Sequence, residues 1–236
     1  MQVAVVQSVT DRDFMTNLTT LLAQYRQAEA DLVLAPEVCL TGFCYDRMPE
    51  AAAFAKAALE RLCLEVGEKA LALTMIEAGD GGYYNVGRVI HKGSVIHTQA
   101  KYKLFPLGNE HRHFLPGTAE GIVPFSFKGV QVGMLICFEL RFPELWARLK
   151  GCALLLVPAM WGGPRRGHIV TLSEALAIIN RAFVAVADSA DAEMAGASGF
   201  ITPWGEALRQ EGPGVVTGEV DPRQIALLDR AIPLSP

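Results

Sequence analysis

The chain has 236 residues, of which 51% are hydrophobic and 19% charged, a composition that supports a large buried core and excludes an intrinsically disordered protein. Its 21 basic and 25 acidic residues give a net charge of −4, and no cluster of Lys or Arg indicates a nucleic-acid or membrane partner. The longest apolar run, residues 152–161, contains Pro158 and is far shorter than the roughly 20 residues that cross a bilayer. We therefore expect a folded protein with no membrane span.

Residues 1–7 (MQVAVVQ) have neither a basic leader segment nor a small-residue cleavage site, and they are typical of a first core strand. A cytoplasmic location is the expectation. The cysteines are scattered, with no CxxC pair and no His at zinc-finger spacing, which disfavours a structural zinc site and a disulfide framework. There are five of them: Cys39, Cys44, Cys63, Cys137 and Cys152.

Strands and helices alternate in the first part of the chain. Apolar runs throughout the strands are typical of a sheet covered on both faces. We predict strands over residues 2–8, 31–37 and 70–76, with helices over 17–27 and about 49–67.

The pattern then changes to hairpins and returns to alternation. We predict hairpins from 83–91 with 95–101 and from 122–127 with 130–136, a helix from about 143, a strand at 153–157, a helix over about 164–181, and strands at 183–187, 198–202 and 215–220. No segment has the composition of a linker. We expect residues 1–236 to form a single α/β domain with mixed sheets.

Three polar residues follow predicted strands: Glu37, Lys101 and Cys137. Because ligand sites in open α/β sheets lie beyond the carboxyl ends of strands, the three side chains could converge. An ammonium lowers the pKa of a nearby thiol and can stabilise an oxyanion, while a carboxylate can accept and return a proton. Together they suffice for acyl transfer from an amide or nitrile. By spacing alone, the more common explanations are a strand cap or salt-bridge carboxylate, a solvated lysine and a core cysteine.

Cys137 also lies between a strand and the helix that begins near Pro143. Such a turn exposes a nucleophile and directs backbone N–H groups toward one point. The Phe138 N–H is therefore a candidate oxyanion donor.

Residues 133–145 (GMLICFELRFPEL) resemble the nucleophile motif of the carbon–nitrogen hydrolase (nitrilase) superfamily. Residues 34–43 (LAPEVCLTGF) resemble that family's glutamate motif, and residues 101–106 (KYKLFP) resemble its lysine motif. The three motifs occur in the family's order. Two lysines stand in the last motif, and the family pattern assigns the catalytic role to Lys101, with Lys103 at a histidine-like position.

Later segments extend the resemblance over nearly the whole chain. Glu110, followed by residues 114–117 (FLPG), matches the family's second glutamate, which positions substrate; without the motif it would be a solvated loop carboxylate. Residues 151–161 (GCALLLVPAMW) resemble the strand that lines the pocket, so Trp161 is a candidate pocket wall or an ordinary core residue. Residues 199–206 (GFITPWGE) resemble a late family motif.

One segment departs from the family pattern. Residues 175–180 (ALAIIN) stand where many relatives have a charged Arg and Glu, here replaced by Leu176 and Ile179. Because both charges are absent together, no uncompensated charge is left behind. We expect an altered packing or subunit contact of this helix, with catalysis intact. The chain is also short for the family, through trimmed loops.

For other conspicuous polar residues, a structural explanation competes with a functional one. For His111 and His113 we favour an exposed loop over a pocket entrance, and for Arg141 a structural role. Arg165 and its neighbours could bind a substrate carboxylate or begin a solvated helix.

The resemblance implies a four-layer αββα sandwich of the nitrilase type, pairing through the helices after the nucleophile into a homodimer or larger homo-oligomer. It implies a hydrolase of a small carboxamide, ω-amide-like, that releases ammonia through a cysteine thioester. Cys137 would attack, Glu37 would be general base and then acid, and Lys101 with the Phe138 N–H would hold the oxyanion. Neither a metal nor an organic cofactor is implied.

The residues after Cys137, RFPE at 141–144, are nearer to the omega-amidase and deaminated-glutathione-amidase branch than to true nitrilases. Hydrolysis of an N-carbamoyl amide or a nitrile stays an alternative. The competing class is a non-catalytic scaffold or binding module in which Cys137 is merely buried.

Overall fold

Two six-stranded mixed sheets form the centre of the computed structural model, which describes residues 1–233. In spatial order, the first sheet consists of β12 (Gly214–Glu219), β1 (Gln2–Gln7), β2 (Leu32–Leu34), β3 (Ala70–Gly79), β4 (Gly82–His91) and β5 (Ser94–Ala100). The second consists of β11 (Ala207–Arg209), β10 (Gly199–Ile201), β9 (Phe183–Ala187), β8 (Leu154–Pro158), β7 (Val130–Met134) and β6 (Phe125–Phe127). Each sheet has a parallel centre, β1-β2-β3 and β7-β8-β9, with antiparallel strands on either side.

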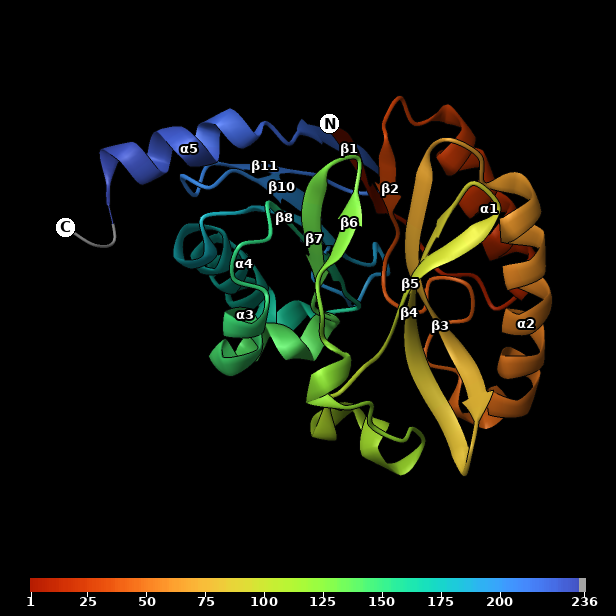
Figure 1. Ribbon diagram of the computed structural model, residues 1–236. Coiled ribbons are helices and arrows are strands. Elements are labelled where there is room, and N and C mark those ends of the chain that lie inside the picture. The colour runs from red at the N-terminus through yellow and green to blue at the C-terminus, as the bar shows by residue number, and fades with distance from the viewer. Residues whose placement is uncertain (234–236) are drawn as a thin grey trace.

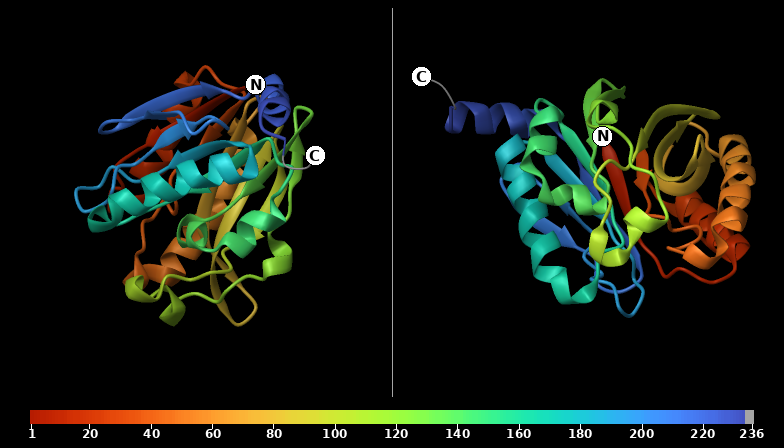
Figure 2. Two further views of the ribbon diagram at one scale, coloured as in Figure 1. Left: turned by 90° about the vertical axis from the view of Figure 1, so that its left-hand side faces the viewer. Right: turned by 90° about the horizontal axis from the view of Figure 1, so that it is seen from below.

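The helices cover the outer faces of the two sheets. They are α1 (Phe14–Gln27), α2 (Met48–Glu65), α3 (Pro143–Arg148) and α4 (Arg166–Asn180), whereas α5 (Pro222–Ala231) buries only Leu228 and extends away from the sheets (Figure 1). Figure 1 and the right panel of Figure 2 show α1 and α2 on one side, α3 and α4 on the other, and the sheets between them. The predicted four-layer αββα sandwich is confirmed.

The alternation of side chains along β1 explains the layers. Val3 and Val5 point between the two sheets, where they join residues of the second sheet such as Leu154 in one core. Ala4 and Val6 point the other way and pack against α1 and α2. Because both faces of the strand are covered, its sequence is apolar throughout.

Most predicted elements lie where expected, and the differences have local causes. Helix α1 begins at Phe14, three residues earlier than predicted, because the Asp13 side chain caps the N–H groups of Met15 and Thr16. Strand β11 and helix α5 were not predicted. All three β11 residues are at least partly exposed, and Leu228 is the only buried residue of α5, so neither carries a strong apolar pattern.

The helix that carries the departure from the family pattern is α4. Of the two residues that replace the family's charged pair, Leu176 is fully buried in the core, so it cannot take part in a subunit contact. Ile178 and Ile179 are 53% and 64% exposed. No helix within residues 1–233 is long and apolar enough to span a membrane.

Candidate active site

Glu37 lies three residues after β2 and is fully buried. Its Oε1 accepts a hydrogen bond from Asn85 Nδ2 at 2.8 Å, and its Oε2 accepts one from the Met160 N–H at 3.2 Å. The two bonds come from different sheets, because Asn85 belongs to β4 and Met160 follows β8. They fix the carboxylate at the junction of the sheets.

Lys101 directly follows β5 and is also fully buried. Its Nζ donates to Glu37 Oε1 at 2.7 Å and to Glu110 Oε1 at 2.8 Å. Burial alone would lower the pKa of Lys101, but the two carboxylates outweigh it and raise that pKa above its ordinary value. Lys101 is therefore a fixed ammonium. Lys103, by contrast, is half-buried near the surface, with its Nζ 3.9 Å from Glu144 Oε1.

Glu110 completes what we call the carboxylate–lysine cluster, Glu37, Lys101 and Glu110. Glu110 begins the 3-10 helix Glu110–Arg112, and only 3% of the residue is exposed. It is therefore not a solvated loop carboxylate, which was the alternative interpretation. Its Oε2 accepts a hydrogen bond from the Phe105 N–H at 3.0 Å. Burial raises the pKa of Glu110, and the attraction of Lys101 opposes that rise.

Cys137 begins the 3-10 helix Cys137–Arg141, three residues after β7. Its φ is 49°, in the left-handed region, which costs a residue other than glycine on the order of 1–2 kcal/mol. Such strain at a turn that presents a nucleophile is known from other hydrolases. Phe138 stands in the first turn of this helix, and its N–H has no acceptor among residues 1–233. It is free to bind an oxyanion.

The pKa of the Cys137 thiol runs against the simplest expectation from the sequence. An ammonium nearby was expected to lower it, and Lys101 does act in that direction. Burial and the negative charges of Glu37 and Glu110 are stronger, however, and raise the pKa well above its ordinary value. Burial and the two carboxylates therefore favour the thiol form of Cys137 over the thiolate.

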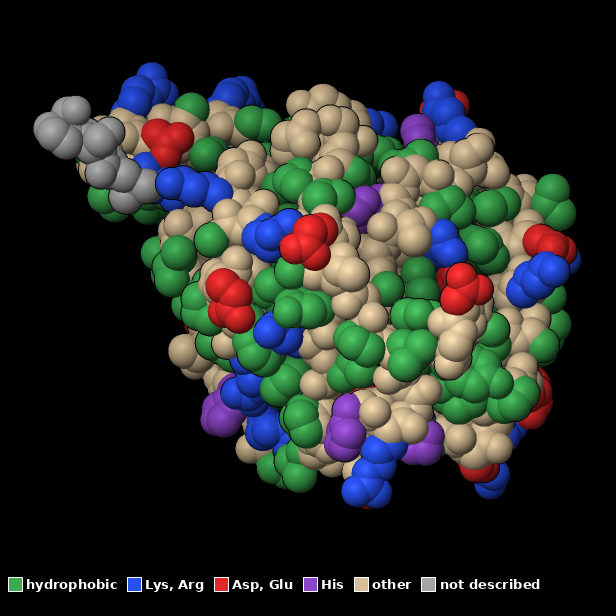
Figure 3. All heavy atoms as spheres, turned by 60° about the horizontal axis from the view of Figure 1, so that its bottom comes forward, with side chains coloured by type: hydrophobic (Ala, Val, Ile, Leu, Met, Phe, Trp, Pro, Cys, Tyr) green, Lys and Arg blue, Asp and Glu red, His purple; other side chains and the backbone are tan. Residues whose placement is uncertain are grey.

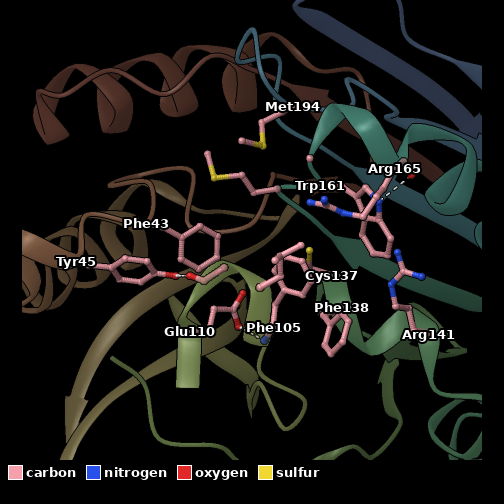
Figure 4. A pocket seen from close by; sticks show the side chains of 14 residues that line it. Phe43, Tyr45, Phe105, Glu110, Cys137, Phe138, Arg141, Trp161, Arg165 and Met194 are labelled. Atoms are coloured by element: carbon pink, nitrogen blue, oxygen red, sulfur yellow. Dashed lines mark hydrogen bonds between the residues drawn. The ribbon is translucent and has the colours of Figure 1, made fainter. Parts of the chain in front are cut away.

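Cys137 lines a cavity of about 310 Å³, near the lower end of the range for small-molecule sites. Figure 4 shows Phe43, Tyr45 and Glu110 on one side of it and Trp161, Arg141 and Arg165 on the other, with Cys137 between them. Much of the lining is apolar, and the remaining members include Phe105, Phe138, Met160 and Met194.

One side of this pocket is an arginine wall, which we define as Arg141, Trp161 and Arg165. The Arg141 guanidinium lies 4.8 Å from the Trp161 ring centroid, and the indole Nε1 donates to the Arg165 carbonyl at 2.9 Å. Neither arginine forms an ion pair with a carboxylate of residues 1–233. Burial and the neighbouring charge of Arg165 lower the pKa of Arg141. We favoured a structural role for Arg141, and the structure also places it in the lining of the pocket.

The histidines near the site do not join the carboxylate–lysine cluster. His111 is exposed, His113 stacks on Tyr45 with ring centroids 4.1 Å apart, and His168 Nδ1 lies 3.0 Å from Arg141. In Figure 3, which shows the molecule obliquely from below, basic and histidine side chains lie along the lower edge of the face and also at its upper edge and centre. Within residues 1–233, no group of three His, Cys, Asp or Glu is arranged to hold a metal ion.

Three buried polar residues around the site were not found from the sequence: Asn85, Glu139 and Asp188. Asn85 is a polar residue inside a β-rich run, and this feature of the sequence could have indicated its role. Glu139 and Asp188 accept hydrogen bonds only from backbone N–H groups, so no second side chain in the sequence indicates their role.

Comparison with known proteins identifies the family of the chain. A family model described as Carbon-nitrogen hydrolase matches residues 2–230. A 2-oxoglutaramate amidase of Bacillus subtilis is 32% identical over 87% of this chain and 83% of its own length. The omega-amidase YafV of Escherichia coli K12 is 30% identical over 75% of this chain and 71% of its own length.

Solved structures share the fold at lower sequence identity. An amidase of Nesterenkonia sp. AN1, with acrylamide added to its active-site cysteine, has a TM-score of 0.84 and 24% identity, over 98% of this chain and 99% of that one. The CN-hydrolase superfamily protein XC1258 of Xanthomonas campestris, with an arsenic adduct in its active site, has a TM-score of 0.85 and 23% identity, over 99% of this chain and 95% of that one. The family model and the Bacillus relative show that this chain belongs to the carbon-nitrogen hydrolases, enzymes that hydrolyse carbon–nitrogen bonds.

Proposed function

We propose that this chain hydrolyses a small carboxamide to a carboxylate and ammonia through a thioester on Cys137. The observation that carries the proposal is the buried Lys101, held by Glu37 and Glu110 beside a pocket that Cys137 lines. Burying three charged side chains is costly, and a folded core has no need of them. Perturbed ionisable groups that meet at a cleft are typical of active sites.

In the first half of the reaction, the Cys137 sulfur attacks the amide carbon while its proton passes to Glu37. The carbonyl oxygen becomes an oxyanion, which the Lys101 ammonium and the Phe138 N–H stabilise. Glu37 then gives the proton to the amide nitrogen, the carbon–nitrogen bond breaks, and ammonia leaves. A thioester remains on Cys137.

In the second half, a water molecule attacks the thioester while Glu37 takes one of its protons. The same two donors hold the second oxyanion. When the carbon–sulfur bond breaks, the sulfur takes the proton back from Glu37, and the carboxylic acid leaves. Glu110 keeps Lys101 charged and in place through both halves, and it can accept a hydrogen bond from the substrate's amide nitrogen.

The substrate class that fits the pocket best is the monoamide of a short dicarboxylic acid. The arginine wall offers two guanidinium groups without a carboxylate partner in the described chain, and Arg is suited to binding a carboxylate. The amide end would then meet Cys137, which lies between the arginine wall and Glu110 (Figure 4). Relatives named 2-oxoglutaramate amidase and omega-amidase act on amides of this kind by their names.

The test is a screen for ammonia release by the purified protein. The panel contains 2-oxoglutaramate, succinamate, neutral short amides, N-carbamoyl amino acids and nitriles. The proposal predicts the highest kcat/KM for the monoamides that carry a carboxylate. Preference for carbamoyl compounds or nitriles would establish the alternative activities, and no turnover of any compound would favour a non-catalytic scaffold.

We also propose that the protein is a homodimer that pairs through α4. Ile178 and Ile179 expose apolar side chains there, and burying them between subunits would be favourable. Ile179→Glu should place an unpaired charge in that contact and shift the protein toward monomer by light scattering. An unchanged dimer would remove this part of α4 from the interface.

Two further expectations complete the proposal. Residues 1–236 act as one carbon-nitrogen hydrolase domain, which the family match over residues 2–230 supports. The protein resides in the cytoplasm, which the five free cysteines support because free thiols persist in reducing compartments. Limited proteolysis and cell fractionation test these two expectations.

A further inference from the structure

Glu139 is a buried carboxylate that the reaction above does not use. It is fully buried, and no Lys, Arg or His within residues 1–233 forms an ion pair with it. Burial raises its pKa to about 7, although the N–H groups of Ile136 and Tyr102 act in the opposite direction. A carboxylate in such a place is destabilising unless its hydrogen bonds compensate for the lost water.

The hydrogen bonds of Glu139 reach the backbone beside two reacting groups. Its Oε1 accepts from the Tyr102 N–H at 2.6 Å, and from the Lys103 N–H at a longer 3.4 Å. Its Oε2 accepts from the Ile136 N–H at 2.7 Å. Tyr102 directly follows Lys101, and Ile136 directly precedes Cys137.

These two segments belong to different sheets. Lys101 directly follows the edge strand β5 of the first sheet, whereas Cys137 follows β7 of the second. The turn at Cys137 is further closed by the Glu139 N–H, which donates to the Ile136 carbonyl at 3.1 Å. One side chain thus joins the strained turn that presents the sulfur to the strand end that presents the ammonium.

We propose that Glu139 is a positioning residue that sets the placement of Lys101 Nζ relative to the Cys137 sulfur. The inference rests on the proposed function of this site. Glu139 does not line the pocket, so it acts through Lys101 and Cys137 and not on the substrate. Its contribution should therefore be to the rate of the chemical step and not to substrate binding.

Asp188 offers a matched control, because it is another fully buried carboxylate bound by backbone N–H groups. It accepts from Trp161 at 2.8 Å, from Ser189 at 3.0 Å and from Ala197 at 3.0 Å. Burial raises its pKa to about 6. The two residues differ in the segments that they bind. Asp188 binds the backbone of Trp161 in the arginine wall, whereas Glu139 binds the backbone next to Lys101 and Cys137.

The first experiment compares the kinetics of Glu139→Gln and Asp188→Asn with the best amide of the panel. Glu139→Gln puts an amide NH₂ against one of the two backbone segments, so it should lower kcat about 100-fold and leave KM within about twofold. Asp188→Asn should raise KM about tenfold and change kcat much less. A general loss of packing would affect both variants alike, and this result would overturn the proposal.

The second experiment is a double-mutant cycle with Lys101→Ala. If Glu139 acts by placing Lys101 and Cys137, its replacement should cost almost nothing further once the ammonium is gone. The cycle is measured both on amide turnover and on the rate at which iodoacetamide labels Cys137. Labelling needs no substrate, so it decides the role of Glu139 even if no amide is turned over. Additive losses in the labelling cycle would overturn the proposal.

If Glu139→Gln does not fold, Glu139→Asp takes its place in both experiments. It keeps the charge and both acceptor oxygens, but a side chain shorter by one methylene cannot reach both segments unless they move. We expect a smaller loss, about tenfold in kcat, that again disappears in the Lys101→Ala background. A wild-type kcat with wild-type labelling would contradict the positioning role.

Discussion

The two sides of the pocket are built in opposite ways. In the carboxylate–lysine cluster every side chain is buried, and each has its partner in the described chain, at distances of 2.7 and 2.8 Å. In the arginine wall the guanidinium groups of Arg141 and Arg165 are half-buried and have no carboxylate partner within residues 1–233.

This difference separates chemistry from recognition. Charges that must stabilise a transition state are fixed before the substrate arrives, because reorganising them during the reaction would cost rate. Charges that bind the substrate are left available to it. Replacements in the cluster should therefore lower kcat, and replacements in the wall should raise KM.

The largest effect should come from the nucleophile between the two sides. Cys137→Ala should reduce ammonia release to background and leave the fold intact, because it removes one buried sulfur atom. Cys137→Ser should also be nearly inactive, since a hydroxyl is far harder to ionise than a thiol. Steady-state turnover and circular dichroism check this, and turnover by pure Cys137→Ala would move the chemistry elsewhere.

The next largest effect should come from the lysine of the cluster. Lys101→Ala should lower kcat about 1000-fold, as the loss of an oxyanion donor does in other hydrolases. Lys103→Ala is the matched control two residues away, and it should change kcat less than about threefold because its ammonium lies near the surface. The opposite order of damage would show that the wrong lysine has been assigned.

Glu110→Gln should have an intermediate effect. The variant keeps a side chain of the same size but removes the charge that holds Lys101, so turnover should fall about 100-fold. Iodoacetamide should still label Cys137, because the sulfur is retained. The comparison of turnover with labelling separates a positioning role from a solvated loop residue, for which both rates would stay at wild-type values.

The smallest effect should come from the wall. Arg165→Gln should raise KM about tenfold for a monoamide that carries a carboxylate, about the contribution of one charged hydrogen bond. KM for a neutral amide of the same length should stay within twofold. Equal changes for both substrates would show that the wall does not recognise the carboxylate.

Much of the fold could be predicted from the sequence because its signals are local. Strands such as β3 and β8 are continuous apolar runs, and the β4–β5 hairpin has a Gly in its turn. Helix α5 escaped prediction because it buries one residue, so little of its sequence is constrained by packing.

The residues of the site also fall into those that the sequence predicts and those that it does not. Glu37, Lys101 and Cys137 stand at strand ends within motifs, so the sequence places them together. The side chains of Glu139 and Asp188 are bound only by backbone N–H groups. Nearly every residue has such a group, so no particular residue type in the sequence identifies these partners. The direction predicted for the pKa shift of the Cys137 thiol was wrong for a related reason. The shift depends on burial and on the sum of three charges, and only the folded arrangement determines these.

The most direct test of the account is to trap the acyl-enzyme. Wild-type protein and Glu37→Gln are mixed with the best amide of the panel, quenched in acid within the first turnover, and analysed by mass spectrometry of the intact chain and its peptides. For the wild-type protein, the account predicts an added mass equal to the substrate less ammonia, on the peptide that contains Cys137 and on no other cysteine peptide. Glu37→Gln is the control and should carry no such adduct, because it lacks the group that takes the thiol proton and releases ammonia. Ammonia release at the wild-type rate with no adduct on Cys137, or with the adduct on another residue, would contradict the account.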